Sequence, residues 1–241
     1  MMEDMEHSDP FEFRRVTSPE ALEEVFRLRY QVYCNECRFI RAEDYPDGFE
    51  TDGYDGHAAH FGAYDKEGRL VGSVRLILPS CGRFPIEEHC PTLNVDPVKV
   101  PLRKSAEISR LTISKLYRRR AQDGLYYEPQ VEDVPIQEKG QYFMRRVRPM
   151  AFGLYREMYQ ESKRLGIRYW YALMEKTLRT LLKIHGFVFN PIGPEVEFYG
   201  LVTPYLADVS ELEKNVHERF PQFFDYFMDR LEPQLQPRFS R

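Results

Sequence analysis

The spacing of apolar residues predicts helices and strands along most of the chain. A helix is predicted to begin after Ser18, where a hydroxyl residue precedes Pro19 in the order typical of a helix N-terminus. Apolar residues then recur at helical spacing, but Arg29 lies on the same face. Strands are predicted over 57–64 and 69–78, joined by a short polar turn that ends in glycine. The chain is therefore expected to start with a helix and a β-hairpin.

The later part of the chain also alternates between segments with the apolar spacing of a helix and segments with that of a strand. A strand is predicted over 106–114, where apolar residues occupy both even and odd positions, as in a strand that is covered on both faces or carries a bulge. Gly166 and Gly186 are expected to end two helices, and a capping box over 210–213 is expected to open a final helix. The remaining expected elements are helices over 149–165 and 177–185 and strands over 167–174, 187–189 and 196–206.

Composition narrows the class of protein. The chain has 241 residues, of which 42% are hydrophobic and 30% charged, as is typical of a folded globular protein. No apolar run reaches the roughly 18 residues that a membrane-spanning helix needs, and the N-terminus lacks the apolar core of a secretory signal. We expect a cytoplasmic protein without an integral membrane segment, and peripheral attachment to the inner membrane is left open. A net charge of −4 argues against nucleic acid as the main partner.

Four cysteines raise the question of a metal site. Cys34 and Cys37 form a C-x-x-C pair, and His89 precedes Cys90. The second pair, Cys81 and Cys90, is separated by eight residues instead of the short spacing of a zinc knuckle. Reduced thiols are the common state in a cytoplasmic protein, so we expect no bound metal.

Four charged residues lie in elements that are expected to be buried: Arg29, Arg75, Glu107 and Arg110. Isolated buried charges are strongly unfavourable, so these side chains are expected to pair with one another or to line a polar cleft. Glu107 and Arg110 are three residues apart and would point to opposite faces of a regular strand. We expect a β-bulge between them, which would also expose a backbone N–H.

Four short motifs occur in a fixed order along the chain. They are Arg29-x-x-x-Tyr33, Glu50-x-Asp52-x-x-Asp55, Gly72-Ser73-Val74-Arg75-Leu76 and Glu107-Ile108-Ser109-Arg110-Leu111. In this order they resemble the motifs of the acyl-homoserine-lactone (autoinducer) synthases, which run R-x-x-x-F, E-x-D-x-x-D, a strand ending in A-R-L, and E-x-S-R-F. Across residues 11–210 the chain resembles more closely two related groups, the PEP-CTERM/exosortase-system-associated acyltransferases and the N-acyl amino acid synthases. The segments Pro85-Ile86-Glu87-Glu88-His89-Cys90 and Leu181-Leu182-Lys183-Ile184-His185-Gly186-Phe187 are part of that likeness.

The resemblance implies a fold and a reaction. These families have the GNAT acyltransferase fold, a mixed twisted sheet flanked by helices, which agrees with the α/β (α+β) order of the predicted elements. The implied activity is that of an N-acyltransferase without a tightly bound cofactor. It would move a fatty acyl group from acyl-carrier protein, or from acyl-CoA, to the amine of a small molecule.

Three parts of the chain are expected from the resemblance and the element order. Residues 1–14 would form a flexible arm, 15–209 the acyltransferase domain, and 210–241 a helical extension rich in aromatic residues. That extension would cover the core, contact a second copy of the chain or contact a membrane surface, and the sequence does not separate these options.

The chemistry of acyl transfer suggests roles for the motif residues. Aminolysis of a thioester needs a neutral amine, a proton acceptor, and hydrogen-bond donors for the developing oxyanion. Glu50, acting through water, is the candidate base, and Glu107 is the second catalytic candidate. The alternative for the whole set is a structural network that shapes the cleft without touching substrate. The candidate substrate-binding residues are Arg29, Asp52, Asp55, Arg75 and Arg110.

The donor site is expected just after the last motif. Arg118, Arg119 and Arg120 lie where a GNAT protein has its pyrophosphate-binding turn, but the usual glycine-rich form of that turn is missing. This difference favours an acidic carrier protein with a phosphopantetheine arm over CoA. The acyl chain is expected between the sheet and the helix that carries Leu154 and Met158.

One feature separates the chain from the autoinducer synthases. Those enzymes have a tryptophan shortly after the first helix, associated with binding S-adenosylmethionine, whereas the only tryptophan here is Trp170. The difference favours another amine, such as an amino acid. The alternatives are an acyl-homoserine-lactone synthase that uses S-adenosylmethionine, a CoA-dependent acetyltransferase of the same fold, and a non-catalytic or zinc-bearing interaction module.

Overall fold

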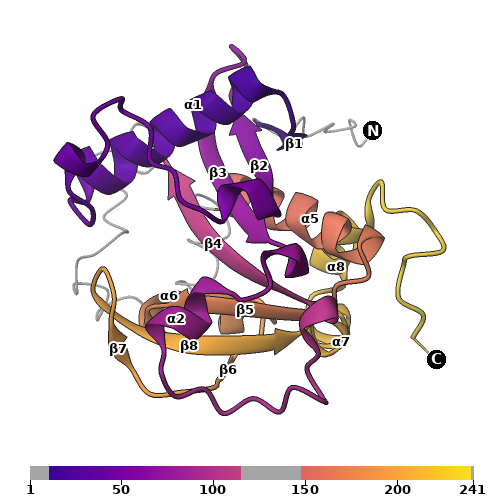
Figure 1. Cartoon of the computed structure of the whole chain (residues 1–241). Coiled ribbons are helices and arrows are strands. Elements are labelled where there is room, and N and C mark those ends of the chain that lie inside the picture. The colour runs from indigo at the N-terminus through magenta and orange to yellow at the C-terminus, as the bar shows by residue number, and fades with distance from the viewer. Residues whose placement is uncertain (1–10, 115–147, 240–241) are drawn as a thin grey trace, which may run out of the picture.

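A mixed β-sheet forms the centre of the molecule (Figure 1), which we describe from a computed structural model over residues 11–114 and 148–239. The strands are β1 (Glu12–Val16), β2 (Ala58–Tyr64), β3 (Leu70–Ile77), β4 (Ser105–Ile113), β5 (Tyr169–Met174), β6 (Asn190–Pro191), β7 (Val196–Glu197) and β8 (Leu201–Asp208). Within the described residues their order in the sheet is β1-β2-β3-β4-β5-β8-β6, and β7 pairs with β8. The pairs along this order are antiparallel except β4 with β5, which is parallel.

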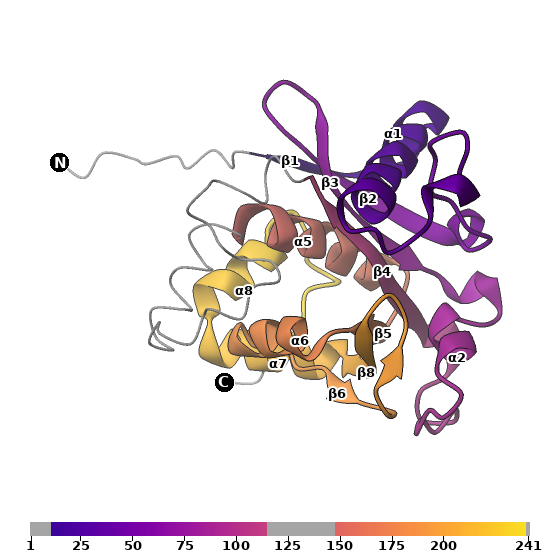
Figure 2. The ribbon, with the colours of Figure 1, turned by 90° about the vertical axis from the view of Figure 1, so that its left-hand side faces the viewer.

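Helices cover both faces of this sheet. The helices are α1 (Pro19–Tyr30), α2 (Pro85–His89), α5 (Arg148–Arg164), α6 (Lys176–Ile184), α7 (Val209–Arg219) and α8 (Pro221–Met228). A π-helical segment, η1 (Gln31–Glu36), continues α1, and single 3-10 turns lie at Ala42–Asp44, Asp55–His57, Pro79–Cys81 and Leu102–Lys104. Figure 2 shows α1 and α5 on opposite sides of the sheet, and α5 packs on β1, β2 and β3. The predicted α/β (α+β) class with a mixed twisted sheet is therefore confirmed.

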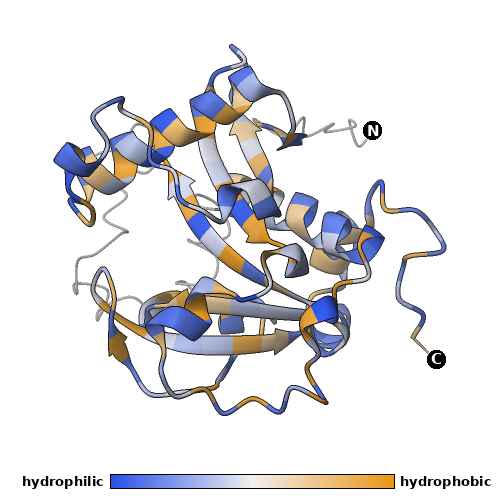
Figure 3. Cartoon of the chain, in the orientation of Figure 1, coloured by the Kyte–Doolittle hydropathy of each residue, from blue (hydrophilic) through white to orange (hydrophobic). Residues whose placement is uncertain are grey.

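Local sequence signals explain where several helices begin and end. Ser18 caps α1 as predicted, because its hydroxyl accepts a hydrogen bond from the Ala21 N–H at 3.2 Å. Gly166 and Gly186 follow α5 and α6 with φ angles of 67° and 86°, a conformation that glycine adopts without penalty at the end of a helix. Figure 3 shows hydrophilic and hydrophobic residues alternating along α1, as in a helix with one side against the sheet.

Our prediction of a flexible arm over residues 1–14 is wrong for residues 12–14. These residues belong to β1, which pairs with β2 from Glu12 opposite Tyr64 to Val16 opposite His60. Phe13 points into the core and its ring lies over Gly153 of α5, where any Cβ would collide with it. The strand was hard to recognise because most of its residues are polar and face outward.

The second half of the sheet differs from the prediction in detail. Residues 187–189 are not a strand, and pairing there is limited to β6. The strand predicted over 196–206 is divided into β7 and β8 by a turn in which Tyr199 has a φ of 55° and Gly200 a φ of 111°. The cap of α7 is Asp208, whose side chain accepts a hydrogen bond from the Ser210 N–H, and not the predicted capping box.

The aromatic C-terminal part of the chain contacts the core. Phe223 and Phe227 of α8 are buried and pack against Phe187, with ring centroids 5.9 and 5.5 Å away. Val209, Leu212 and Val216 of α7 belong to the same hydrophobic cluster. Of the three options that the sequence left open for this segment, the structure shows contact with the core.

Candidate active site

The acidic loop between α1 and β2, which carries Glu50, Asp52 and Asp55, is held in place by hydrogen bonds to α1 and within the loop. The Glu50 N–H donates to the backbone carbonyl of Phe26 in α1 at 3.2 Å. Asp55 accepts a hydrogen bond from the Asp52 N–H at 2.8 Å, and Asp52 accepts one from the Tyr54 N–H at 2.9 Å. Such Asp-centred turns fix the backbone locally, so the loop presents its three carboxylates in a defined arrangement.

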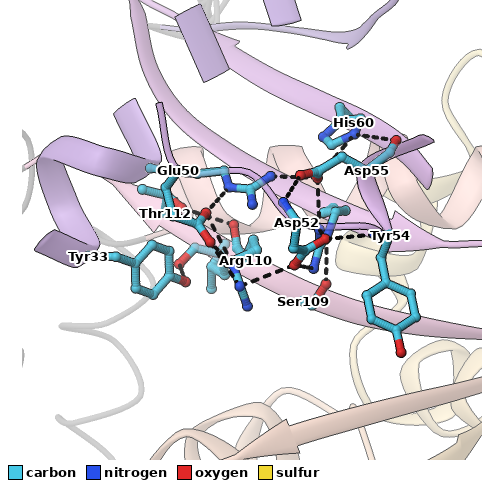
Figure 4. A network of polar contacts seen from close by, with 12 residues as sticks. Tyr33, Glu50, Asp52, Tyr54, Asp55, His60, Ser109, Arg110 and Thr112 are labelled. Carbon is cyan, nitrogen blue, oxygen red and sulfur yellow. Dashed lines mark hydrogen bonds and ion pairs between the residues drawn. The ribbon is translucent and has the colours of Figure 1, made fainter. Parts of the chain in front are cut away.

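Arginines from α1 and β4 meet these carboxylates (Figure 4). Arg29 of α1 donates from Nε to Glu50 and from Nη1 to Asp55, the latter at 2.7 Å. Arg110 of β4 pairs with Glu50 at 2.8 Å and reaches Asp52 at 3.2 Å. Glu50 is completely buried between the two guanidinium groups.

A third arginine, Arg75 of β3, completes the network. It forms two parallel hydrogen bonds to the carboxylate of Asp52, at 2.6 and 2.9 Å, and a third to Asp55 at 2.7 Å. Its Nε donates to the hydroxyl of Ser109 at 3.0 Å. Nε2 of His60 lies 3.3 Å from the backbone oxygen of Asp55, and burial lowers the pKa of this histidine. We call the six ionic side chains the arginine–carboxylate network: Arg29, Glu50, Asp52, Asp55, Arg75 and Arg110.

The network holds its carboxylates in the ionised form. Burial by itself would raise the pKa of Glu50, but the charges of Arg29 and Arg110 outweigh it and hold the pKa below its usual value. In the same way, Arg29 and Arg75 overcome the burial of Asp55 and lower its pKa to about 2. A carboxylate that already accepts hydrogen bonds from two arginines binds a proton weakly, so Glu50 is poorly suited to the role of base.

Two side chains of the network are more exposed than the others. Asp52 is 25% exposed and Arg110 15% exposed, whereas Arg29, Glu50 and Arg75 are buried. Asp52 and Arg110 lie next to each other with opposite charges. The network therefore presents one anionic and one cationic group at its accessible end.

Glu107 has different surroundings, although it lies on the same strand as Arg110. Its side chain is 3% exposed and accepts a hydrogen bond from the Ile86 N–H at 2.9 Å. Burial raises its pKa to about 8, because the hydrogen bond from Ile86 and the more distant charges of Arg75 and Arg110 do not compensate for the loss of water. Glu107 is thus able to gain and lose a proton near neutral pH.

A β-bulge is present in β4, but it is formed by Arg110 and Leu111 and does not lie between Glu107 and Arg110 as predicted. Ser109 pairs with Arg75, and Thr112 pairs with Ser73, so Arg110 and Leu111 together lie opposite Val74 alone. Arg110 has a φ of 52°, a left-handed conformation in which this type of bulge usually has glycine. The extra residue changes the alternation of the strand and explains why its apolar residues change parity.

The sheet opens next to this bulge. β4 and β5 pair from Ser105 opposite Tyr169 to Ile108 opposite Ala172, and no further pairs follow, although both strands continue. Residues 108–111 of β4 are partly exposed, whereas the strand is buried on both sides of them. The bulge therefore lies in a stretch of strand whose edge β5 leaves uncovered.

The structure brings the predicted residues together with several hydroxyl and imidazole groups that were not predicted. The seven predicted catalytic and substrate-binding residues lie on one side of the sheet, six of them within the arginine–carboxylate network and Glu107 beside it. Ser109, His60, Tyr33 and Thr112 were not selected as site residues. Ser109 follows Glu107 at a spacing of two, which places it on the same face, whereas His60 becomes a candidate only once its pairing with Arg75 is known.

Other expectations concern metals, the donor site and the acyl chain. Arg118, Arg119 and Arg120 lie outside the described residues. Leu154 and Met158 are buried in the main hydrophobic cluster. In the parts of the chain that the structure describes, no group of three or more His, Cys, Asp or Glu residues is arranged to hold a metal ion. None of the helices described is long and apolar enough to cross a membrane.

Comparison with known proteins agrees with this fold. Residues 28–127 match a family described as the acetyltransferase (GNAT) domain. A search of curated protein sequences found no match to the chain. The domain match and the arrangement of the strands and helices agree on a GNAT-like fold for this chain.

Solved structures similar to the chain include an acyl-homoserine lactone synthase and an N-acyl amino acid synthase. TofI, in a ternary complex with an inhibitor and MTA, is 15% identical and has a TM-score of 0.61, over 94% of this chain and 99% of TofI. BjaI, a CoA-dependent acyl-homoserine lactone synthase with MTA, is 20% identical with a TM-score of 0.58, over 95% of each chain. FeeM, an N-acyl amino acid synthase from uncultured soil microbes, is 14% identical with a TM-score of 0.52, over 88% of this chain and 96% of FeeM. The chain thus has the fold of these enzymes.

Proposed function

We propose that the protein is an N-acyltransferase that moves a fatty acyl group from the phosphopantetheine thioester of acyl-carrier protein to the amine of an amino acid. The observation that carries the proposal is the β4 bulge, which lies where β4 and β5 separate and beside a carboxyl group with a pKa near 8. An uncovered strand edge offers backbone hydrogen-bonding groups to an extended amide-containing arm such as phosphopantetheine. The same edge brings the thioester next to Glu107.

The accessible end of the network supports an amino acid as the acceptor. A free amino acid carries an ammonium and a carboxylate group a short distance apart. Asp52 would bind the ammonium and Arg110 the carboxylate, since these two network side chains are the most exposed and adjacent. A simple amine would leave Arg110 without an anionic partner from the substrate.

The reaction can be followed atom by atom. After the ammonium loses one proton to solvent water, the neutral nitrogen attacks the thioester carbonyl carbon, and a C–N bond forms as the carbonyl oxygen becomes an oxyanion. Collapse of this intermediate breaks the C–S bond and expels the thiolate. The second nitrogen proton passes to the carboxylate of Glu107 and then to the thiolate, so the products are an N-acyl amino acid and a free thiol.

Glu107 suits the proton transfer better than Glu50. General catalysis is most efficient when the pKa of the catalyst lies near the working pH. With a pKa of about 8, roughly 10% of Glu107 is ionised at pH 7, and that fraction binds a proton firmly. Glu50 is retained in the proposal as the carboxylate that orients Arg29 and Arg110.

The remaining parts of the proposal rest on the resemblance of the sequence to the PEP-CTERM/exosortase-system-associated acyltransferases and the N-acyl amino acid synthases. From it we infer a cytoplasmic location, an association with the PEP-CTERM/exosortase system, and binding of the acidic carrier protein by Arg118, Arg119 and Arg120. It also supports an acyltransferase domain over 15–209, which β1 extends to residue 12, and an extension over 210–241.

The experiment that tests the proposal supplies both possible donors. Purified protein would be incubated with a fatty acyl-carrier protein or the matching acyl-CoA, together with the twenty common amino acids, and the products analysed by mass spectrometry. An N-acyl amino acid formed from the carrier protein is the expected result, and its mass identifies both substrates. A product from acyl-CoA alone would revise the donor. No product from either donor, with folded protein, would overturn the proposed function.

A further inference from the structure

The two backbone carbonyls of the β4 bulge are both bound by side-chain hydroxyls. The phenol of Tyr33, in the π-helical segment η1, donates to the carbonyl of Leu111 at 3.1 Å. The hydroxyl of Thr112 donates to the carbonyl of Arg110 at 2.9 Å. Figure 4 shows Tyr33 and Thr112 beside Arg110. In a regular strand these carbonyls would be bound by the N–H groups of a neighbouring strand, so the hydroxyls replace sheet hydrogen bonds that the bulge disrupts.

We call the hydroxyls of Tyr33 and Thr112 the hydroxyl clamp. The clamp holds a short stretch of backbone in a strained conformation. Arg110 has a φ of 52°, a conformation in which a side chain with a Cβ is strained. Such residues persist when the surrounding structure holds them on several sides, and they gather at functional sites. Here Glu50 holds the guanidinium of Arg110 at 2.8 Å, while the hydroxyl of Thr112 holds its carbonyl.

The clamp also changes which hydrogen-bonding groups remain available. The carbonyl of Arg110 belongs to the same peptide unit as the N–H of Leu111. A hydrogen bond to the oxygen of a peptide polarises that unit and makes its N–H a stronger donor. With both bulge carbonyls occupied by hydroxyls, the backbone at the uncovered edge favours an acceptor such as a carbonyl oxygen or oxyanion.

Tyr33 stands where the resembling motif R-x-x-x-F has phenylalanine, so its hydroxyl is an addition to that pattern. The ring lies 5.6 Å from the guanidinium of Arg110, which a phenylalanine ring would also allow. Only the hydroxyl reaches the carbonyl of Leu111. Burial raises the pKa of this phenol, so it stays protonated and able to donate at any working pH.

We propose that Tyr33 and Thr112 are positioning residues, whose hydroxyls hold the β4 bulge so that the Leu111 N–H hydrogen-bonds the thioester oxygen as it becomes negative. The inference rests on the proposed acyl-transfer function. Neither side chain touches the reacting atoms, and both act through the backbone of Arg110 and Leu111.

The test compares variants that remove one hydroxyl with variants that keep it. Tyr33→Phe and Thr112→Val each remove a donor with little change in shape, while Thr112→Ser retains it. Each single loss is expected to lower kcat about 10-fold, a fraction of the effect of removing an oxyanion donor itself. KM for donor and amine should stay within a factor of about two, because the hydrogen bond to the thioester oxygen contributes little until that oxygen becomes negative. Thr112→Ser should recover most of the wild-type kcat.

Matched controls separate positioning from stability. Tyr159→Phe removes a buried tyrosine hydroxyl that donates to Glu213 at 2.7 Å, and Thr180→Val removes a hydroxyl that donates to the Lys176 carbonyl at 2.8 Å. Both pairs lie outside the site, so these variants should keep the wild-type kcat even where Tm falls. A kcat for Tyr33→Phe and Thr112→Val equal to that of the controls would overturn the inference while leaving the proposed function intact.

A spectroscopic readout follows the hydrogen bond itself. The infrared band of an acyl donor labelled with ¹³C at its thioester carbonyl moves to lower frequency as a donor approaches the oxygen. In Thr112→Val and Tyr33→Phe the band of the bound donor should lie at higher frequency than in the wild type. An unchanged band would contradict the clamp. If the wild type binds the donor but transfers no acyl group, the proposed function fails, and this band still decides whether the hydroxyls control the bulge.

Discussion

Glu50 and Glu107 are both buried carboxyl groups in the same part of the molecule, yet their pKa values are shifted in opposite directions. Glu50 lies between two guanidinium groups, and these lower its pKa despite burial. Glu107 accepts one hydrogen bond from a backbone N–H, and burial raises its pKa to about 8. Burial alone therefore does not determine protonation. The number of cationic donors within hydrogen-bond distance decides which carboxyl group stays charged and which one exchanges a proton.

The largest expected effect comes from removing one charge of the arginine–carboxylate network. Asp55→Asn keeps the shape of the side chain but leaves Arg29 and Arg75 buried with too few anions. Removing one partner of a buried ion pair lowers the free energy of unfolding by about 3–5 kcal/mol. Urea denaturation at pH 7 measures this change.

A surface ion pair serves as the control for that measurement. Lys214 lies 3.9 Å from Glu218 on the exposed side of α7. Lys214→Ala is expected to change the free energy of unfolding by less than about 0.5 kcal/mol. If Asp55→Asn were as mild as this control, the network would be a set of weak contacts and the contrast with Glu107 would lose its basis.

The next effect concerns turnover. Glu107→Gln keeps an oxygen that can accept the hydrogen bond of the Ile86 N–H but cannot take up a proton. Loss of a general base is expected to lower kcat about 100-fold, with no loss of thermal stability. Glu50→Gln should also lower turnover, but together with stability, because Arg29 and Arg110 lose their shared anion. A Glu107→Gln enzyme with wild-type kcat would remove Glu107 from the mechanism.

A further effect, comparable over the whole pH range to that of Asp55→Asn, appears in the dependence of stability on pH. The folded-state pKa of Glu107, about 8, lies above that of an exposed glutamate, so the folded protein binds the extra proton. This contribution is complete below about pH 4 and is lost as the pH rises through 8, with a slope that approaches about 1.4 kcal/mol per pH unit. Asp55, with a pKa of about 2, acts in the opposite sense and loses its contribution as the pH falls from about 4 through 2.

Urea denaturation of the wild type and Glu107→Gln between pH 5 and 9 measures the alkaline part of this curve. The difference in unfolding free energy between the two proteins should grow in favour of the variant as the pH rises to about 8 and stay constant above it. Parallel curves would mean that Glu107 is ionised in the folded protein throughout this range, like Glu50.

The β4 strand shows which features of the site can be predicted from the sequence and which cannot. The change of parity among its apolar residues predicts a bulge, and the structure has one at Arg110 and Leu111. The expected position between Glu107 and Arg110 is wrong, because the strand is regular up to Ser109. The fixed order of the four motifs likewise predicts a charged site on a sheet. Neither argument reveals that the carbonyls of the bulge are bound by Tyr33 and Thr112, because Tyr33 approaches from a π-helical segment nearly 80 residues earlier in the chain.

Local signals along the chain were sufficient to predict the α/β (α+β) class, the hairpin of β2 and β3, the glycine ends of α5 and α6, and the residues that carry charge into the core. These features depend on local periodicity and on the conformational preferences of single residues. The pairing of each arginine with its carboxylates depends on the folded structure, and so do the opposite pKa shifts of Glu50 and Glu107. The physical reason is that a pKa shift is set by charges and donors within a few ångströms, and those neighbours come from segments far apart in the sequence.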